Sequence, residues 1–101
     1  MASAALSPRA RRDLLEATQW IAKDNRATAE GLRHAVVDAA QRIGAHPLIG
    51  VLRPEWADEP VRFLALTGLP YLIVYDASRD PPLILRVLHG ARDMPTVLGG
   101  S

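Results

Sequence analysis

Three arginines lie on or just after expected strands, and they are the residues best suited to bind an anionic surface. Arg62 and Arg86 fall inside stretches of apolar residues, and Arg92 follows the second of these stretches. A guanidinium presents a fixed fork of N–H donors that matches a carboxylate or a phosphate. The alternative is a structural role, either solvated or paired with a nearby acid such as Asp93. Because Arg86 has Leu, Val and Ile neighbours, it needs a partner if it is buried.

One histidine and two tyrosines add groups that a ribonuclease can use. His89 ends the last expected strand, and because an imidazole titrates near neutral pH, it can serve as a general acid or base. Tyr71 and Tyr75 share one strand face, where they could stack on bases. Each also has a structural alternative. The histidine can bond backbone groups at the strand end, and the tyrosines can pack in a core with their hydroxyls at its rim.

Several other kinds of site are excluded by the sequence. The chain has no cysteine, so it has no disulfide, zinc–thiolate site or thiol nucleophile. The spacing of His34, His46 and His89 is not typical of a metal site. The sequence contains no convincing carboxylate pair, no Gly-rich phosphate loop and no nucleophile elbow. We therefore expect neither a metal ion nor another cofactor.

The charge of the chain is nearly balanced. Its 101 residues carry a formal net charge of +1, which is too small for nucleic-acid binding by bulk electrostatics. Lys23 is the only lysine among 12 basic residues, an excess of Arg that either favours bidentate contacts or reflects coding bias. No apolar run approaches the roughly 20 residues of a membrane span, and the first six residues are not a signal peptide. We expect a cytoplasmic protein with no membrane partner.

Two amphipathic helices are predicted in the first half of the chain. Ser7 is expected to cap a helix over residues 8–23, because a serine hydroxyl can accept from a free amide of the first turn. Asn25 is expected to cap a second helix, whose apolar residues recur three and four apart. That helix is predicted to end near Gly44. The short break between the helices predicts an antiparallel hairpin.

A loop is predicted over residues 46–60, which contain three prolines. Four apolar residues of this loop are expected to pin it to the core. They are Leu48, Ile49, Val51 and Leu52.

Three stretches rich in β-branched and aromatic residues follow the loop, at residues 61–67, 71–76 and 83–89. Their short connections predict that consecutive strands are antiparallel neighbours. Residues 4–6 are a further candidate strand, and residues 94–101 are expected to form a short tail. The predicted fold class is α+β, with one domain over residues 1–101. In it, the N-terminal helical hairpin packs on a three- or four-stranded antiparallel sheet.

Five short segments carry a family pattern along nearly the whole chain. They read LSPRA at 6–10, WIAKDN at 20–25, RI at 42–43 with HPLIG at 46–50, LPYLIVY at 69–75 and ILRVLHGARD at 84–93. The last segment is the most specific, and the others agree with it in order and spacing. Together with the order of helix, helix and strand meander, they resemble the RelE/ParE superfamily of toxins, and its ParE branch more closely.

This resemblance implies a toxin of a type II toxin–antitoxin system, held in a hetero-oligomer by its cognate antitoxin. ParE-like members inhibit DNA gyrase, whereas RelE-like members are endoribonucleases that cleave mRNA on the ribosome. RelE-like toxins commonly use a cluster of Lys and Arg with a late Tyr or His. Here only Arg62, Arg86 and His89 are candidates for such a catalytic set. We therefore favour a non-enzymatic gyrase inhibitor, with the ribosome-dependent nuclease as the alternative.

Two sets of binding residues are expected. The polar residues on and after the strands are expected to contact the target, namely Arg62, Tyr71, Tyr75, Arg86, His89 and Arg92. The antitoxin is expected to cover apolar surface, because such surface usually marks a binding site and exposed tryptophans often anchor partners. The residues in this second set are Trp20, Leu48, Ile49, Val51 and Leu52. Acidic residues of the antitoxin are expected to meet Arg62 or Arg86 and so mask the target-binding patch.

Overall fold

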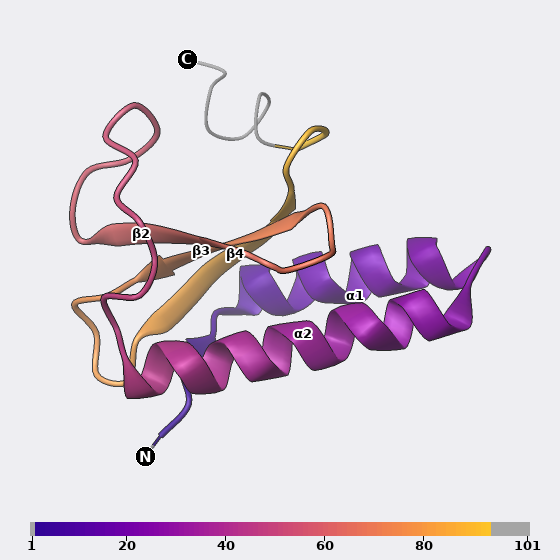
Figure 1. Cartoon of the computed structure of the whole chain (residues 1–101), viewed down its shortest axis with the longest axis horizontal. Helices are drawn as coiled ribbons and strands as arrows, with labels where there is room; N and C mark the ends of the chain where they lie inside the picture. The colour runs from indigo at the N-terminus through magenta and orange to yellow at the C-terminus, as the bar shows by residue number, and fades with distance from the viewer. Residues whose placement is uncertain (1, 94–101) are drawn as a thin grey trace.

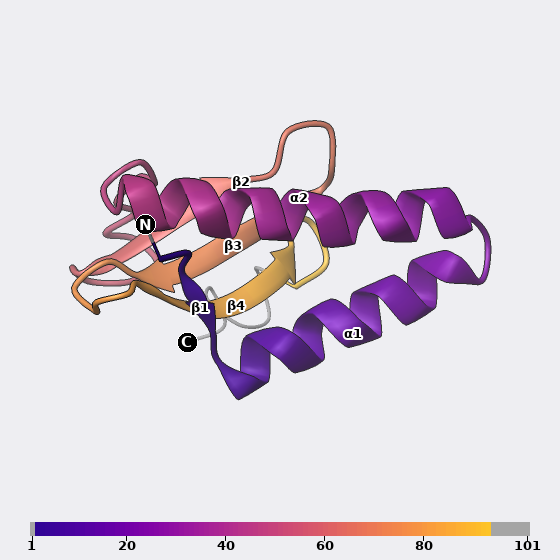
Figure 2. The same cartoon turned by 90° about the horizontal axis from the view of Figure 1, so that it is seen from below.

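The computed structural model describes residues 2–93, which form a helical hairpin on one face of a four-stranded sheet (Figures 1 and 2). The predicted α+β class and the hairpin-on-sheet arrangement are confirmed. The predicted tail, residues 94–101, lies outside the described residues. In chain order the elements are β1 (Ala5–Leu6), α1 (Pro8–Ala22), α2 (Arg26–Ala45), β2 (Val61–Ala65), β3 (Tyr71–Asp76) and β4 (Leu83–His89).

Both helices begin at the predicted caps. The Ser7 side chain accepts a hydrogen bond from the amide of Ala10, and the Asn25 side chain accepts one from the amide of Thr28. Each bond satisfies an amide that the first helical turn would otherwise leave without a partner. Within the described residues, neither helix is long and apolar enough to cross a membrane.

α2 ends at Ala45, close to Gly44 as the sequence predicted, but Gly44 itself lies inside the last turn of the helix. The N-terminal segment crosses the helix here, and the amide of Ala4 donates to the carbonyl of Ala40 at 2.9 Å. A Cβ at position 44 would overlap the carbonyl oxygen of Ala2 and lie 2.8 Å from the Cα of Ser3. The glycine therefore permits a close backbone crossing rather than a helix end.

The sheet is mixed, which corrects the prediction of a purely antiparallel sheet. Its strand order is β1-β4-β3-β2, and the β2–β3 and β3–β4 pairs are antiparallel as predicted. The candidate strand at the start of the chain is present as β1, but it pairs with β4 in parallel. The whole helical hairpin and two other strands separate β1 from β4, so no tight turn imposes an antiparallel pairing.

The main core lies between the hairpin and the sheet. Leu32 and Val36 of α2 are buried there, and Leu14 and Ile21 of α1 pack against the same cluster while staying partly exposed. A smaller cluster on the other face of the sheet is covered by part of the 46–60 loop. It consists of Phe63, Val74 and Leu88, with Trp56, Ala57, Val61 and Leu72 packed around them.

The loop between α2 and β2 is not pinned to the core in the way the sequence predicted. Leu48 and Val51 are 68% and 55% exposed, so the prediction is wrong for these two residues. Ile49 does pack against the main cluster, and Leu52 is half-buried. The backbone of Val51 pairs with Phe63 at the outer edge of β2, with N–O distances of 2.8 and 2.9 Å, and this pairing fixes the loop through its backbone.

Candidate functional site

The predicted target-binding residues fall into two groups at different places on the sheet. His89 pairs with Tyr71 across β4 and β3, whereas Arg62 pairs with Tyr75 across β2 and β3. Tyr71 and Tyr75 are four residues apart along β3, so the two residue pairs are separated by roughly 13 Å along the strand direction. Arg62 is also two strands away from His89. One group comprises Tyr71, Arg86, His89 and Arg92, and the other comprises Arg62 and Tyr75.

Arg62 and Tyr75 hold the 46–60 loop in place. The Tyr75 hydroxyl donates to the carbonyl of Pro47 at 2.6 Å and accepts from the amide of Gly50 at 2.9 Å. Arg62 Nη1 donates to the carbonyl of Gly50 at 2.8 Å. Burial raises the pKa of Tyr75, and the Gly50 amide partly opposes this shift. Because Tyr75 is fully buried, the expectation that it contacts a target is corrected to a structural role.

The other group surrounds a groove of about 520 Å³ between α1 and the end of β4. We call it the α1–β4 groove. Trp20, in the last full turn of α1, is 61% exposed at this groove. The lining residues comprise three arginines, three acids, two aromatic residues and two small apolar ones. They are Arg9, Arg86, Arg92, Asp13, Glu16, Asp93, Trp20, Tyr71, Ala17 and Val87.

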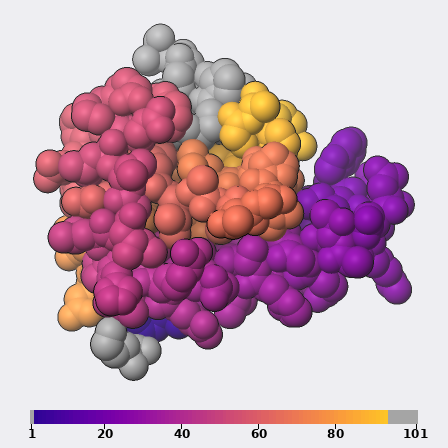
Figure 3. Space-filling model, in the orientation of Figure 1, coloured from indigo at the N-terminus to yellow at the C-terminus, as the bar shows by residue number. Residues whose placement is uncertain are grey.

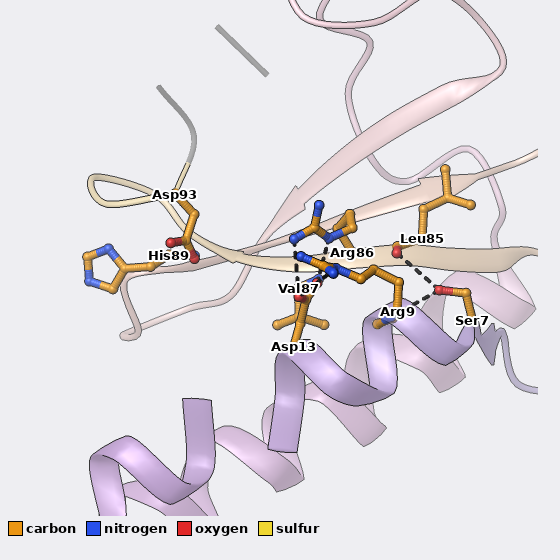
Figure 4. Close-up of polar contacts among 9 residues, drawn as sticks. Ser7, Arg9, Asp13, Leu85, Arg86, Val87, His89 and Asp93 are labelled. Carbon is orange, nitrogen blue, oxygen red and sulfur yellow. Dashed lines mark hydrogen bonds and ion pairs between the residues drawn. The ribbon is translucent and has the colours of Figure 1, made fainter. Parts of the chain in front are cut away.

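The start of α1 is fixed to the outer edge of β4. Strand β1 pairs with β4 only at Leu83 and Ile84, so the edge beyond Ile84 has no strand beside it. Ser7 bonds there twice, since its amide donates to the carbonyl of Ile84 at 2.9 Å and its hydroxyl to that of Leu85 at 3.0 Å (Figure 4). The β3–β4 register shifts at this point and leaves Leu85 without a ladder partner. Ile84 and Val87 are three residues apart, which would place them on opposite faces of a regular strand. The shift allows both to belong to the main core cluster.

Asp13 links α1 to β4 at the base of the groove (Figure 4). Its side chain is 7% exposed and accepts from the Val87 amide at 3.0 Å and from Arg86 Nε at 2.7 Å and Nη2 at 3.2 Å. Arg9 Nε lies 3.6 Å from the same carboxylate. The hydrogen bond with Asp13 is the main cause that raises the pKa of Arg86. Asp13 therefore supplies the partner that the sequence required for Arg86.

The turn after β4 holds His89, Arg92 and Asp93 together. The His89 amide donates to Asp93 at 2.8 Å, and His89 Nδ1 accepts from the Arg92 amide at 3.1 Å. An accepting Nδ1 requires the imidazole tautomer that carries its proton on Nε2. Burial alone would raise the pKa of Asp93, but the bonds from His89 and Arg92 lower it overall. His89 therefore makes the backbone contact expected of a structural histidine, with its ring edge-on to Tyr71 at 5.3 Å.

Asp13 was not among the residues predicted for the site. A signal for it is nevertheless present, because Asp13 lies three residues after Ala10 and four before Ala17, on the buried stripe of α1. A carboxylate on such a stripe needs donors from another element. The sequence does not identify that element, because the partners Arg86 and Val87 are more than 70 residues away.

The predicted antitoxin-binding residues lie at two ends of the hairpin. Trp20 is next to the turn that joins the helices, whereas the loop containing Leu48 and Val51 follows the far end of α2 (Figure 1). The 20 residues of α2 separate these ends by about 30 Å. A partner that contacts both regions must extend along the molecule.

The groove combines mixed charges with residue types that are common in protein–protein interfaces. Its lining contains as many acids as arginines, so it is not the uniformly basic surface that nucleic acid favours. Trp, Tyr and Arg are the residue types that contribute most to protein–protein binding, and all three are present here. Residues 2–93 contain no cluster of three His, Cys, Asp or Glu side chains that could hold a metal.

Comparisons with known proteins agree with this fold. The family model described as ParE toxin of type II toxin-antitoxin system, parDE, matches residues 4–94. The fold is similar to a solved structure titled "Chromosomal ParDE TA system from P. aeruginosa", with a TM-score of 0.68. That match has 21% sequence identity over 88% of this chain and 96% of that chain, a likeness that shows the fold alone. No curated protein sequence matches this chain.

Proposed function

Because the chain belongs to the ParE toxin family of type II toxin–antitoxin systems, we propose that it inhibits DNA gyrase and that a cognate antitoxin neutralises it. The target-binding surface in this proposal is the α1–β4 groove, with Tyr71, Arg86, His89 and Arg92 on the sheet side. Trp20 faces them from α1. The family match includes every residue that lines the groove.

The observation that carries the proposal is the way Asp13 holds Arg86. Two of the three guanidinium nitrogens of Arg86 bond the buried carboxylate, and this fixes the side chain before any partner arrives. Arg86 is 22% exposed, so part of it remains available at the groove. A side chain that is already ordered loses less entropy on binding, which favours a specific protein interface.

The ribonuclease alternative has less support from the geometry. A nuclease of this size needs its acid, base and cationic groups within reach of one phosphate. Arg62 lies two strands and several residues away from His89, and its guanidinium bonds the 46–60 loop. His89 Nδ1 is occupied by a backbone amide. These contacts favour an inhibitor that is not an enzyme.

We place the antitoxin on two exposed features. Trp20 supplies one anchor in the groove, and Leu48 with Val51 supplies the other at the far end of the hairpin. Ile49 and Leu52 contribute less because they are partly covered by the protein itself. An antitoxin segment that runs between these anchors would cover the groove and thereby block the target.

Purified gyrase, DNA and the purified toxin test the proposal. We expect cleaved DNA to accumulate, and Trp20→Ala to weaken this effect at least about tenfold, as expected for a central tryptophan anchor. Val37→Ala is the matched control, because Val37 is similarly exposed but lies on α2 and does not line the groove. Cleavage of mRNA on ribosomes that His89→Ala abolishes, with gyrase unaffected, would instead establish the nuclease alternative.

A further inference from the structure

The helix side of the α1–β4 groove presents three different kinds of side chain in a fixed order. Arg9, Glu16 and Trp20 line the groove from the first turn, the middle and the last turn of α1. The rise of the helix separates Arg9 from Glu16 by about 10 Å and Glu16 from Trp20 by about 6 Å. A partner segment that follows α1 therefore meets a cation, then an anion and then an aromatic ring.

The positive charge at the start of the groove is not fully balanced by the protein itself. The Asp13 carboxylate accepts from two nitrogens of Arg86 and from the Val87 amide. Arg9 Nε lies 3.6 Å from the same carboxylate, which is too far for a hydrogen bond, and the Arg9 side chain is 56% exposed. Because one carboxylate cannot neutralise two guanidinium groups, a positive charge remains at Arg9.

The negative charge at the middle of the groove is also not balanced. Glu16 is exposed, and it takes part in no salt bridge among residues 2–93. Asp93 differs from it, because that carboxylate accepts from Arg92 Nε at 3.2 Å and from the His89 amide at 2.8 Å. A partner can therefore form a new ion pair at Glu16 without breaking one that the toxin already has.

The far end of the groove is aromatic. Trp20 is 61% exposed there and shares the groove with Ala17 and Tyr71. Figure 3 shows the yellow residues at the end of β4 opposite the dark purple end of α1, with a notch between them. This end of the groove suits an apolar side chain, since exposed tryptophan and tyrosine rings commonly anchor such groups in protein interfaces.

We propose that the antitoxin segment in this groove carries an acidic side chain at Arg9, a basic one at Glu16 and an apolar one at Trp20. The inference rests on the proposed function, which places the antitoxin here, and it adds the chemistry and the direction of the segment. A reversed segment would leave the apolar side chain beside Arg9 and would place no apolar group on Trp20. Ordered charges of this kind contribute more to specificity than to affinity, because wrongly placed charges repel.

Two neutral substitutions test the charge order by calorimetric titration with the purified cognate antitoxin. Arg9→Gln and Glu16→Gln should each weaken antitoxin binding by about threefold or more, because each removes one ion pair at the interface. Arg12→Gln and Glu30→Gln are the matched controls. They make the same chemical changes at exposed positions that do not line the groove, and they should leave the affinity unchanged.

The direction of the Glu16→Gln effect is decisive. A uniformly acidic antitoxin segment would be repelled by Glu16, so this substitution would then strengthen binding and overturn the proposal. Affinities equal to those of the two controls would overturn it as well. Because exposed ion pairs are screened by salt, the differences between Arg9→Gln or Glu16→Gln and the unaltered toxin should shrink as the salt concentration rises.

Gyrase inhibition by the unaltered toxin separates this proposal from the proposed function. If both groove substitutions weaken antitoxin binding but the toxin does not inhibit gyrase, the charge order stands and the gyrase assignment fails. If the toxin inhibits gyrase and the antitoxin relieves the inhibition, but Glu16→Gln binds the antitoxin as tightly as Glu30→Gln does, the charge order fails alone.

Discussion

At the scale of single residues, the α1–β4 groove depends on a buried carboxylate at its base, that of Asp13. Its side chain accepts from the Val87 amide of β4 and from Nε and Nη2 of Arg86, so one carboxylate satisfies an amide at the strand edge and also orders the arginine. The buried side-chain polar atoms of the described residues all have hydrogen-bond partners. Replacing Asp13 therefore leaves several donors without an acceptor at once.

The substitution Asp13→Asn tests this role. It preserves the size of the side chain but removes its charge, so we expect the free energy of unfolding to fall by about 2–4 kcal/mol. Urea denaturation followed by circular dichroism measures the change. Glu16→Gln is the control on the same helix, since Glu16 is exposed, and it should change stability by less than about 0.5 kcal/mol. Equal effects of the two substitutions would show that Asp13 is not structurally important.

Asp93 gives the stability of the molecule a defined dependence on pH. Its pKa is lowered in the folded protein from an ordinary value of 3.8. Its ionised form is therefore favoured by folding, and the resulting stability is present above pH 3.8 and is lost as the pH falls through the folded pKa.

We expect Asp93→Asn to reduce the free energy of unfolding by about 0.5–1 kcal/mol at neutral pH. The difference between the two proteins should shrink when the pH falls below the ordinary pKa of the carboxyl. Denaturation curves at a series of pH values measure this. A difference that stays constant down to about pH 2 would contradict the assignment.

At the scale of elements, the helical hairpin is attached to the edge of β4 at the start of α1. The cap residue Ser7 serves both the helix and the strand edge, so the start of α1 is fixed to the sheet by the same side chain that begins the helix. Strand addition at this edge is restricted, because carboxylates already occupy the amides of Val87 and His89. At the opposite edge, Val51 occupies the backbone groups of Phe63. Partners are therefore expected to recognise side chains more than strand edges.

Two glycines of α2 provide a matched test of the packing around the helical hairpin. A Cβ at Gly31 would meet nothing within 4 Å, so Gly31→Ala should stabilise the protein by up to about 1 kcal/mol through helix propensity. Gly44→Ala places the same methyl group against the backbone of Ala2 and Ser3 and should destabilise it by about 1–3 kcal/mol. Thermal unfolding of both variants measures the opposite shifts. The crossing of the N-terminal segment would be disproved if Gly44→Ala were also stabilising.

The sequence predicted those elements that depend on local patterns. The caps Ser7 and Asn25 and the strands β3 and β4 have the predicted positions, because hydrophobic period and capping chemistry act over a few residues. The parallel pairing of β1 and the ion pair of Asp13 with Arg86 depend on residues more than 70 positions apart. The loop prediction failed for Leu48 because hydrophobicity alone does not reveal that Tyr75 and Arg62 bond the loop through its backbone.

At the scale of the whole molecule, the surfaces that we propose for gyrase and for the antitoxin share the α1–β4 groove but not the far end of the hairpin. Trp20 belongs to both proposed surfaces, whereas Leu48 and Val51 belong only to the antitoxin surface. We therefore expect gyrase and antitoxin to compete. When the purified toxin–antitoxin complex is titrated with gyrase, each binding event should weaken the other. Simultaneous and undiminished binding of both would show that the surfaces are separate.

Variants at the two ends of the hairpin distinguish the surface that both partners are proposed to share from the surface proposed for the antitoxin alone. Trp20→Ala should weaken the binding of both partners, because its side chain is exposed in the shared groove. Leu48→Asp should weaken antitoxin binding and leave gyrase inhibition unchanged, since Leu48 is 68% exposed and lies beyond the far end of α2. Its high exposure means that the charge costs little in folding, so a loss of antitoxin binding reports on the interface. If Leu48→Asp reduced gyrase inhibition as strongly as Trp20→Ala, the target surface would extend along the hairpin, and the groove alone would not account for toxicity.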